Sequence, residues 1–371
     1  MNRREFSAAL AAAAALTPLR RVAAAQEAPI SERAQALYRR ALILDCNCSP
    51  PDEEHLPLPQ ADLDEARGSG VNVVKLSLGG INSDFAHTVA AIAHVQQMCE
   101  LHPAYFTQVR VAADFERAKR TGKLGIILSF ESADMLAGKL ENFELFRNLG
   151  VRVMQMSYNR KSPFGAGVME PDGGGLTPLG RQAVGEMNRL GIAVDLSHAN
   201  PQTTADVLEL SAVAPLMTHA GCAAVHPHPR NKSDQQLRAL AAKGGVVGIY
   251  DLPYLTASPR QPTVDDYIAH MEHALKVVGE DHVGVGSDAG IDPFDTSPQG
   301  MAEFAKEEEE RHRTGLAAPE EDRPTYVVGL NTPRRIEIIA DRLLQRGHSE
   351  GAVEKIVGSN FARVLTQIWS A

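Results

Sequence analysis

Short apolar runs alternate along the chain with segments in which apolar residues recur every three or four positions. A continuous apolar run of this length is typical of a buried strand, whereas the three- and four-residue spacing is typical of an amphipathic helix. The helical spacing is clearest over residues 88–98, 178–190 and 264–275. The predicted strands cover residues 41–46, 71–77, 124–130, 151–157, 192–197, 214–218, 245–250 and 282–287.

Eight strands that alternate with helices favour an α/β fold, the TIM-type (βα)8 barrel. An open, doubly wound sheet is the alternative. None of the predicted strands is followed by a GxGxxG or GxxxxGK[ST] turn, which counts against nucleotide binding on an open sheet.

Two loops are long. We expect the glycine-rich residues 159–177 to lie over the barrel mouth, and the charged run 306–313 to form a solvated helix rather than a site.

The N-terminal residues have the pattern of an export signal. Arg3 and Arg4 precede an alanine-rich, weakly hydrophobic stretch that ends in Ala23-Ala-Ala. This pattern predicts a twin-arginine signal peptide over residues 1–25, and therefore a periplasmic or secreted protein. A helical arm of a cytosolic protein is the alternative. The remaining residues, 26–371, are predicted to form a single barrel domain.

Composition narrows the class of partner. Hydrophobic residues make up 44% and charged residues 22% of the chain, as in ordinary globular enzymes. The formal charge of −9, without a basic patch, argues against nucleic acid. No later stretch has the 18 apolar residues of a membrane span. The cysteines allow one disulfide in an oxidising compartment but do not define its pairing: Cys46, Cys48, Cys99 and Cys222.

Four potential metal ligands stand where predicted strands end. Glu131, His198, His219 and Asp288 each follow or close an apolar run. The carboxyl ends of barrel strands converge on one mouth, so these side chains are predicted to form a metal site. Imidazole and carboxylate ligands suit zinc and its neighbours. Asp195 lies three residues before His198 and is expected to support the site rather than bind the metal. Hydrogen-bonded capping of the barrel, without a metal, is the alternative.

The chain resembles the membrane (renal) dipeptidase family, zinc peptidases with an amidohydrolase-like barrel. The most specific matching stretches are Gly175-Leu-Thr-Pro-Leu-Gly, Glu186-Met-Asn-Arg-Leu-Gly, Val194-Asp-Leu-Ser-His, Thr218-His, Arg230-Asn, Val283-Gly-Val-Gly-Ser-Asp and Gly358-Ser-Asn-Phe-Ala-Arg-Val-Leu. Their order and spacing agree with the family over nearly all of the chain after the signal.

The resemblance implies a role for each matched residue. Glu131 corresponds to the glutamate that bridges two zinc ions, and His198 and His219 correspond to two histidines that bind one of them. Asp288 matches the aspartate that binds the other zinc and transfers protons. Arg230 matches an arginine that receives the substrate carboxylate, and a guanidinium can grip a carboxylate through two parallel hydrogen bonds.

The chain departs from the family at the first strand. There the family has Asp-Gly-His-Asn-Asp, with the histidine and the last aspartate as ligands, and this chain has Asp45-Cys-Asn-Cys-Ser. Asn47 and Ser49 therefore occupy ligand positions with groups that bind zinc weakly. Tyr158 replaces a family histidine that helps to bind substrate. Its phenol can donate a hydrogen bond to an oxyanion but cannot carry positive charge.

These observations predict a metal-dependent dipeptidase that acts on dipeptides or related small carboxylated amides. We expect one strongly held zinc, with the second site weak or empty. Asp288 and Tyr158 are the predicted catalytic groups. A weakened homologue that only binds small peptides, and a hydrolase of a different ester or lactam, are the alternatives. The oligomeric state stays open, with a homodimer as one option.

Overall fold

The structure is a computed structural model that describes residues 29–51, 56–79 and 83–370. The predicted signal peptide, residues 1–25, lies outside the described residues. Within the described part, no helix is both long and apolar enough to cross a membrane. All four cysteines have free thiols in the structure.

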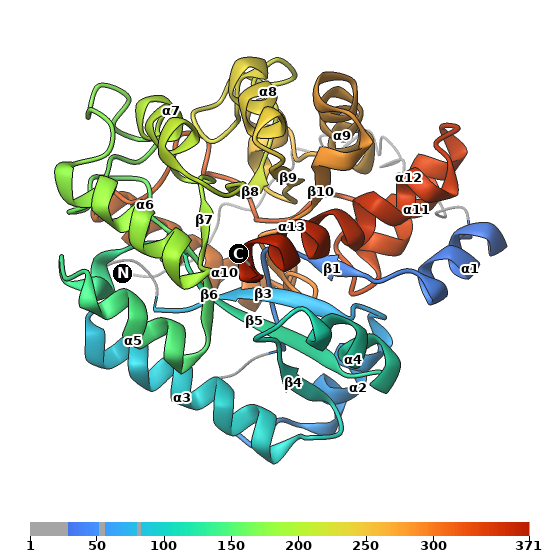
Figure 1. Cartoon of the computed structure of the whole chain (residues 1–371). Helices are drawn as coiled ribbons and strands as arrows, with labels where there is room; N and C mark the ends of the chain where they lie inside the picture. Colours follow the sequence, from blue (N-terminus) through green and yellow to red (C-terminus); the bar gives the residue numbers. More distant parts are fainter. Residues whose placement is uncertain (1–28, 52–55, 80–82, 371) are drawn as a thin grey trace, which may run out of the picture.

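The core of the fold is a ring of parallel strands in the order β1-β3-β5-β6-β7-β8-β9-β10 (Figure 1). The ring closes where the Cys46 amide, just after β1, donates to the Val285 carbonyl of β10 at 3.0 Å. The predicted barrel is confirmed, and the open sheet is wrong. The strands are β1 (Leu44–Asp45), β3 (Val73–Ser77), β5 (Leu124–Phe130), β6 (Val151–Gln155), β7 (Ala193–Asp195), β8 (Leu216–Ala220), β9 (Val246–Ile249) and β10 (Val283–Val285).

Three short strands were not predicted from the sequence. β4 (Phe106–Gln108) pairs with the start of β5, and β2 (Cys48–Ser49) pairs with β11 (Ala289–Gly290) beyond the carboxyl ends of β1 and β10. Each contains only two or three residues, too few to show a hydrophobic period. The β2–β11 pair matters for the site because Asp288 immediately precedes β11.

Helices surround the ring, and most of them begin with a side-chain cap. In α6, the Thr177 side chain accepts from the Gly180 amide, Pro178 occupies the first turn, and Gly191 ends the helix at φ 63°. The helices are α1 (Glu32–Arg40), α2 (Gln60–Gly68), α3 (Phe85–Leu101), α4 (Ala113–Thr121), α5 (Glu141–Leu149), α6 (Pro178–Leu190), α7 (Pro201–Leu210), α8 (Asp234–Ala242), α9 (Val264–Val278), α10 (Pro298–Arg313), α11 (Arg335–Gln345), α12 (Glu350–Glu354) and α13 (Asn360–Trp369).

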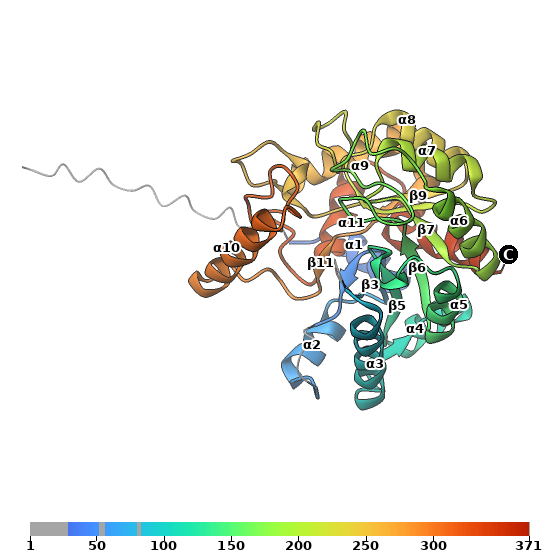
Figure 2. The same ribbon diagram turned by 90° about the vertical axis from the view of Figure 1, so that its left-hand side faces the viewer.

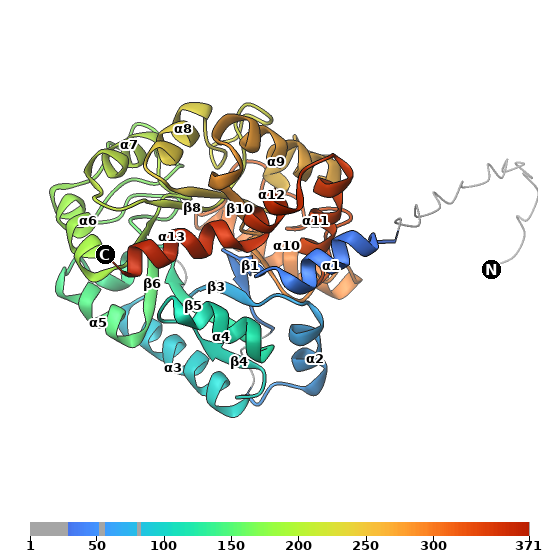
Figure 3. The same ribbon diagram turned by 45° about the vertical axis from the view of Figure 1, so that its right-hand side comes forward.

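One end of the barrel is plugged by α13, which crosses it in Figure 3. Phe361 of α13 belongs to the apolar cluster that fills this end of the barrel, together with Leu44, Val73 and Val246. A Cβ at Gly284 would lie 2.5 Å from the Phe361 ring, so the strand must carry glycine there. The opposite end faces α10, which lies on the far side of the molecule from the C-terminus in Figure 2. The site must therefore open toward α10.

Candidate metal and active site

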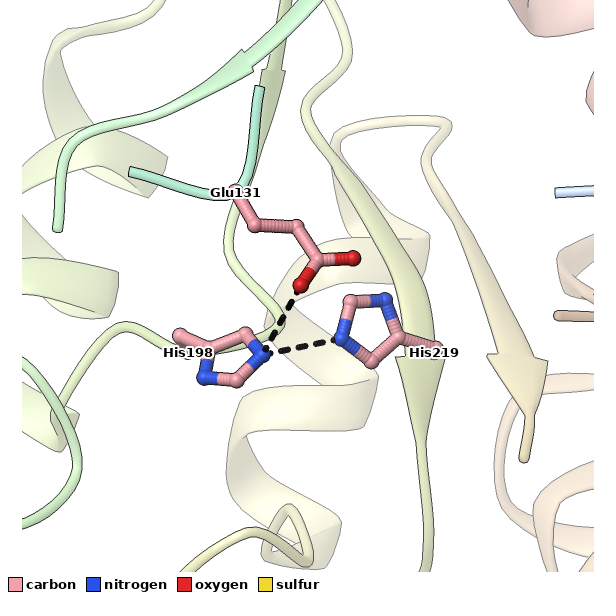
Figure 4. A group of neighbouring side chains, drawn as sticks. All are labelled: Glu131, His198 and His219. Carbon is pink, nitrogen blue, oxygen red and sulfur yellow. Dashed lines mark hydrogen bonds and ion pairs between the residues drawn. The ribbon is translucent and has the colours of Figure 1, made fainter. Parts of the chain in front are cut away.

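Three of the predicted ligands meet at the open end of the barrel (Figure 4). Glu131 follows β5, His198 follows β7, and His219 lies on β8. The Nε2 atoms of the two histidines are 3.0 Å apart, and Nε2 of His198 is 3.9 Å from Glu131 Oε2. All three ligand atoms lie within 4.8 Å of one another, and no other group of three such ligands occurs in the described part of the chain. The strand ends thus bring together the predicted metal ligands.

The imidazole of His198 is oriented by Asn159. Nδ1 of His198 is 2.9 Å from Asn159 Oδ1, while Asn159 Nδ2 donates to the Leu316 carbonyl at 3.0 Å. Because the amide nitrogen of Asn159 is used by Leu316, its oxygen must accept a hydrogen from His198 Nδ1. The lone pair of His198 is therefore on Nε2, which faces Glu131 and His219.

The imidazole of His219 is oriented in the same way by Thr218 and Asp195. The Thr218 hydroxyl donates to Asp195 Oδ2 at 2.6 Å and lies 2.9 Å from His219 Nδ1. Since the hydroxyl hydrogen goes to Asp195, the Thr218 oxygen accepts from Nδ1 of His219, and Nε2 carries the lone pair. Asp195 acts through a neighbouring residue rather than directly, as the sequence predicts for it.

The charge state of this pair suits a cation. Burial, together with the Arg230 guanidinium, lowers the pKa of His198 and His219 well below the usual range. Two neutral imidazoles then point lone pairs at each other at 3.0 Å, with a carboxylate beside them. A divalent cation between them would relieve this repulsion, and two nitrogens with one oxygen are a donor set that zinc accepts. The residues present therefore fit one zinc.

The first-strand positions contain no comparable ligand set. Asn47 points its amide nitrogen at two carboxylates, 2.8 Å from Glu131 Oε1 and 2.5 Å from Asp288 Oδ1. Ser49 is exposed, and Cys48 packs into the apolar core between strands and helices. Asn47 thus lies between the carboxylates as a hydrogen-bond donor, where the family resemblance places a cation.

Asp288 faces the site beside His219. Its Oδ2 is 4.0 Å from His219 Nε2, and its backbone adopts the left-handed region at φ 59°, which is uncommon for a residue other than glycine. Burial and the nearby Glu131 carboxylate raise the pKa of Asp288 above the usual range for a carboxyl. A base with this property, next to a metal site, is suited to accept and return a proton.

Arg230 is positioned to receive an anion. Its side chain is buried, Nη1 donates to the Ser197 carbonyl at 2.6 Å, and Nη2 has no hydrogen-bond partner among the described residues. Arg230, His198 and Asp288 line the same cavity of about 460 Å³. An unpaired buried guanidinium nitrogen is costly unless a ligand completes it, and a carboxylate is its natural partner.

Tyr158 lies against the metal ligands and lines the same cavity. Its ring stacks on His198 with centroids 4.0 Å apart. Burial and the Glu131 carboxylate raise the pKa of Tyr158 to about 12, so the phenol stays protonated and able to donate at neutral pH.

One expectation about the loops needs correction. The charged run 306–313 is not simply solvated, because Glu307, Glu308 and Arg311 of α10 line the cavity, and Glu308 is buried. The loop 159–177 packs on the segment that follows β7, where the Val168 amide donates to the His198 carbonyl at 2.9 Å, and contributes only Asn159 to the cavity wall. The segment from Phe294 to Thr325, rather than this loop, forms most of the wall above the strands.

Several contributors to the site were missed from the sequence. Asn159 orients a ligand, and Arg311 pairs with Glu321 at the cavity wall. Lys232 donates to the carbonyls of Leu196 and Ala199 at 2.9 and 3.0 Å, which fixes the loop on both sides of His198. Of these, only Lys232 lies next to a sequence signal, since it directly follows the matching stretch Arg230-Asn.

Comparison with known proteins agrees with this geometry. The pattern of the family described as membrane dipeptidase (peptidase family M19) matches residues 31–309. The chain belongs to this family. Dipeptidase tcpJ of Claviceps purpurea is 31% identical over 284 residues, which covers 76% of this chain. An uncharacterized protein from Klebsiella pneumoniae is 31% identical over 70% of this chain and 87% of its own length.

A solved structure gives the same fold. An amidohydrolase from Pseudomonas aeruginosa superimposes with a TM-score of 0.79 and 29% identity, over 91% of this chain and 99% of its own. The chain spans only part of the length of its fungal relatives. The aligned region covers 60% of the Claviceps purpurea protein and 54% of an uncharacterized dipeptidase from Schizosaccharomyces pombe.

Proposed function

We propose that this chain is a dipeptidase that uses a single zinc ion held by Glu131, His198 and His219. The observation that carries the proposal is that His198, one of the three oriented ligands, lines the same cavity as Arg230, whose Nη2 atom has no partner among the described residues. The cavity of about 460 Å³ suits a ligand of dipeptide size. Zinc bound there would supply Lewis acidity toward a carbonyl oxygen and toward water.

The side chains around the cavity divide the remaining work. Arg230 holds the C-terminal carboxylate of the substrate through Nη2. Asp288 takes a proton from the water whose oxygen forms the new bond to the carbonyl carbon. It then delivers that proton to the amine as the carbon–nitrogen bond breaks. Tyr158 donates a hydrogen bond to the carbonyl oxygen as negative charge develops on it.

Hydrolysis of a dipeptide panel by metal-stripped and zinc-reconstituted protein tests this proposal. We expect turnover only with zinc, and a loss of more than about 100-fold in kcat/KM for His219→Asn, since loss of a ligand should exceed the 10–100-fold typical of its supporting partners. His348→Asn, a change at a histidine outside the site, is the matched control and should have no effect.

Other outcomes separate the alternatives. Full turnover by the stripped protein would contradict the proposal. Zinc binding and peptide binding without hydrolysis would instead support a homologue that only binds peptides. Cleavage of esters or lactams, but not of dipeptides, would reassign the substrate class.

We also propose, from the sequence alone, that residues 1–25 direct export to the periplasm or outside the cell, and that residues 26–371 act as one domain. Replacing Arg3 and Arg4 by lysine should retain the protein in the cytoplasm, as cell fractionation would measure. Export that persists would contradict a twin-arginine signal. A homodimer is the proposed assembly, and sedimentation of a monomer at micromolar concentration would contradict it.

A further inference from the structure

A lysine is buried inside the barrel beneath the site. Lys75 lies on β3 and is fully buried. Side chains alternate along a strand, and Val73 belongs to the apolar cluster inside the barrel, so Lys75 and Ser77 also point inward. An ammonium group in such a place is costly unless charged or polar partners compensate for the lost water. A role for its charge is therefore to be sought among its neighbours.

The neighbours of Lys75 lead directly to the carboxylates of the site. Lys75 Nζ donates to Ser77 Oγ at 3.1 Å. Ser77 Oγ in turn donates to Glu131 Oε1 at 2.9 Å. Asn47 Nδ2 donates to the same Glu131 oxygen and also to Asp288 Oδ1. A lysine, a serine and an asparagine thus form a continuous set of donors against one face of the two carboxylates.

The charge of Lys75 lies one side chain away from the carboxylates of the site. Ser77 joins its ammonium group to Glu131, and Asn47 joins Glu131 to Asp288. Two buried carboxylates close together repel each other, and a cation nearby offsets this repulsion. One zinc at the histidines leaves the opposite face of Glu131 and Asp288 without a metal, and this is the face that Asn47 contacts.

We propose that Lys75, acting through Ser77, and Asn47 together replace a second metal cation in this protein. In this arrangement Lys75 supplies positive charge and Asn47 supplies the bridging contact that keeps Glu131 and Asp288 in place. Lys75 is a positioning residue that does not touch the substrate. The inference rests on the proposed single-zinc site, and it adds that restoring the first-strand ligands is insufficient to recruit a second zinc while the ammonium remains.

Counting zinc per chain by mass spectrometry after dialysis tests this inference. Three proteins are compared: the unaltered chain, the double variant Asn47→His with Ser49→Asp, and the same double variant with Lys75→Met. We expect one, one and two zinc ions per chain. Removal of the positive charge of Lys75 should raise the affinity for the second zinc ion by at least about tenfold. The control is the double variant combined with Lys119→Met, a change at a lysine of the outer helix α4. It should bind one zinc ion per chain.

Two results would overturn the inference: two zinc ions in the double variant, or one zinc in a folded triple variant. Circular dichroism shows whether each variant is folded. If the Lys75→Met variant does not fold, Lys75→Gln is used in its place. The count does not depend on turnover. If the protein hydrolyses dipeptides with one zinc ion but the zinc counts differ from those expected, the proposed function stands and only the proposed role of Lys75 is wrong.

Discussion

At the scale of single residues, the site depends on side chains that hold other side chains. Both histidines present Nε2 to the candidate metal site because Asn159 and Thr218 accept from their Nδ1 atoms. The sequence revealed the histidines because they close apolar runs. It did not reveal Asn159, since a single asparagine after a strand carries no periodic or spacing signal, and its role arises only where the chain folds it against His198.

Asn159 can be tested through zinc affinity. Asn159→Ala removes the acceptor for His198 Nδ1, which frees the imidazole to rotate and to change tautomer. We expect zinc affinity to fall by about 10–100-fold, as measured by competition with a chelator. Asn159→Asp keeps an acceptor at this position and should retain most of the affinity. Equal losses in the two variants would contradict an orienting role.

Arg230 can be tested through the substrate carboxylate. Arg230→Gln removes the guanidinium, so hydrolysis of dipeptides should fall by about 10–100-fold in kcat/KM, the value of a charged hydrogen-bonded contact. Dipeptide amides lack the carboxylate and should be affected much less. If both kinds of substrate lost activity equally, Arg230 would act on the structure of the site rather than on the carboxylate.

At the scale of elements, α10 shows where sequence patterns fail. Its run of glutamates and arginines is typical of a solvated helix, and most of it is exposed. Yet Glu308 is buried at the cavity wall, because α10 lies across the open end of the barrel. Helical period shows which residues share a face. It does not show whether that face lies against a cavity, because the position of the helix depends on contacts between residues far apart in sequence.

Glu308 gives a prediction about stability and pH. Burial, and the Glu321 carboxylate, raise the pKa of Glu308 from 4.5 to about 7. The folded state therefore binds this proton more tightly than the unfolded chain, and its contribution to stability, full below pH 4.5, is lost as pH rises through 7. Glu308→Gln has no proton to lose, so its Tm relative to the unaltered chain should rise by about 1–3 °C between pH 5 and pH 8.

The neighbouring Glu309 is the matched control for this measurement. It lies on the exposed side of α10, and Glu309→Gln should show no such dependence on pH. A Tm difference for Glu308→Gln that stays constant from pH 5 to pH 8 would contradict the raised pKa.

At the scale of the whole molecule, most of the architecture followed from the sequence. The alternation of apolar runs and amphipathic segments predicted the eight strands of the barrel, and the strand ends predicted which side chains meet. The strands β2, β4 and β11, the plug formed by α13 and the donor set around Lys75 did not follow, because each depends on tertiary contacts without a local pattern. Lys75 in particular interrupts an otherwise apolar run and was absorbed into a predicted strand.

The plug formed by α13 can be tested separately from the site. Phe361 is fully buried in the cluster that fills the closed end of the barrel. Phe361→Ala should lower the free energy of unfolding by about 3–5 kcal/mol, as measured by denaturant titration. Zinc content of the folded variant should be unchanged, since the ligands lie at the opposite end. A loss of zinc without a loss of stability would contradict this separation of the two ends.

Both proposals depend on one zinc ion standing where the family resemblance implies a two-metal centre. The most direct test is the number of zinc ions per chain in the purified, unaltered protein after extended dialysis against zinc-free buffer, determined by mass spectrometry. We expect one zinc ion per chain, and none in the His198→Asn variant. Two tightly held zinc ions would contradict it, since Asn47 would then be a ligand rather than a replacement for a cation.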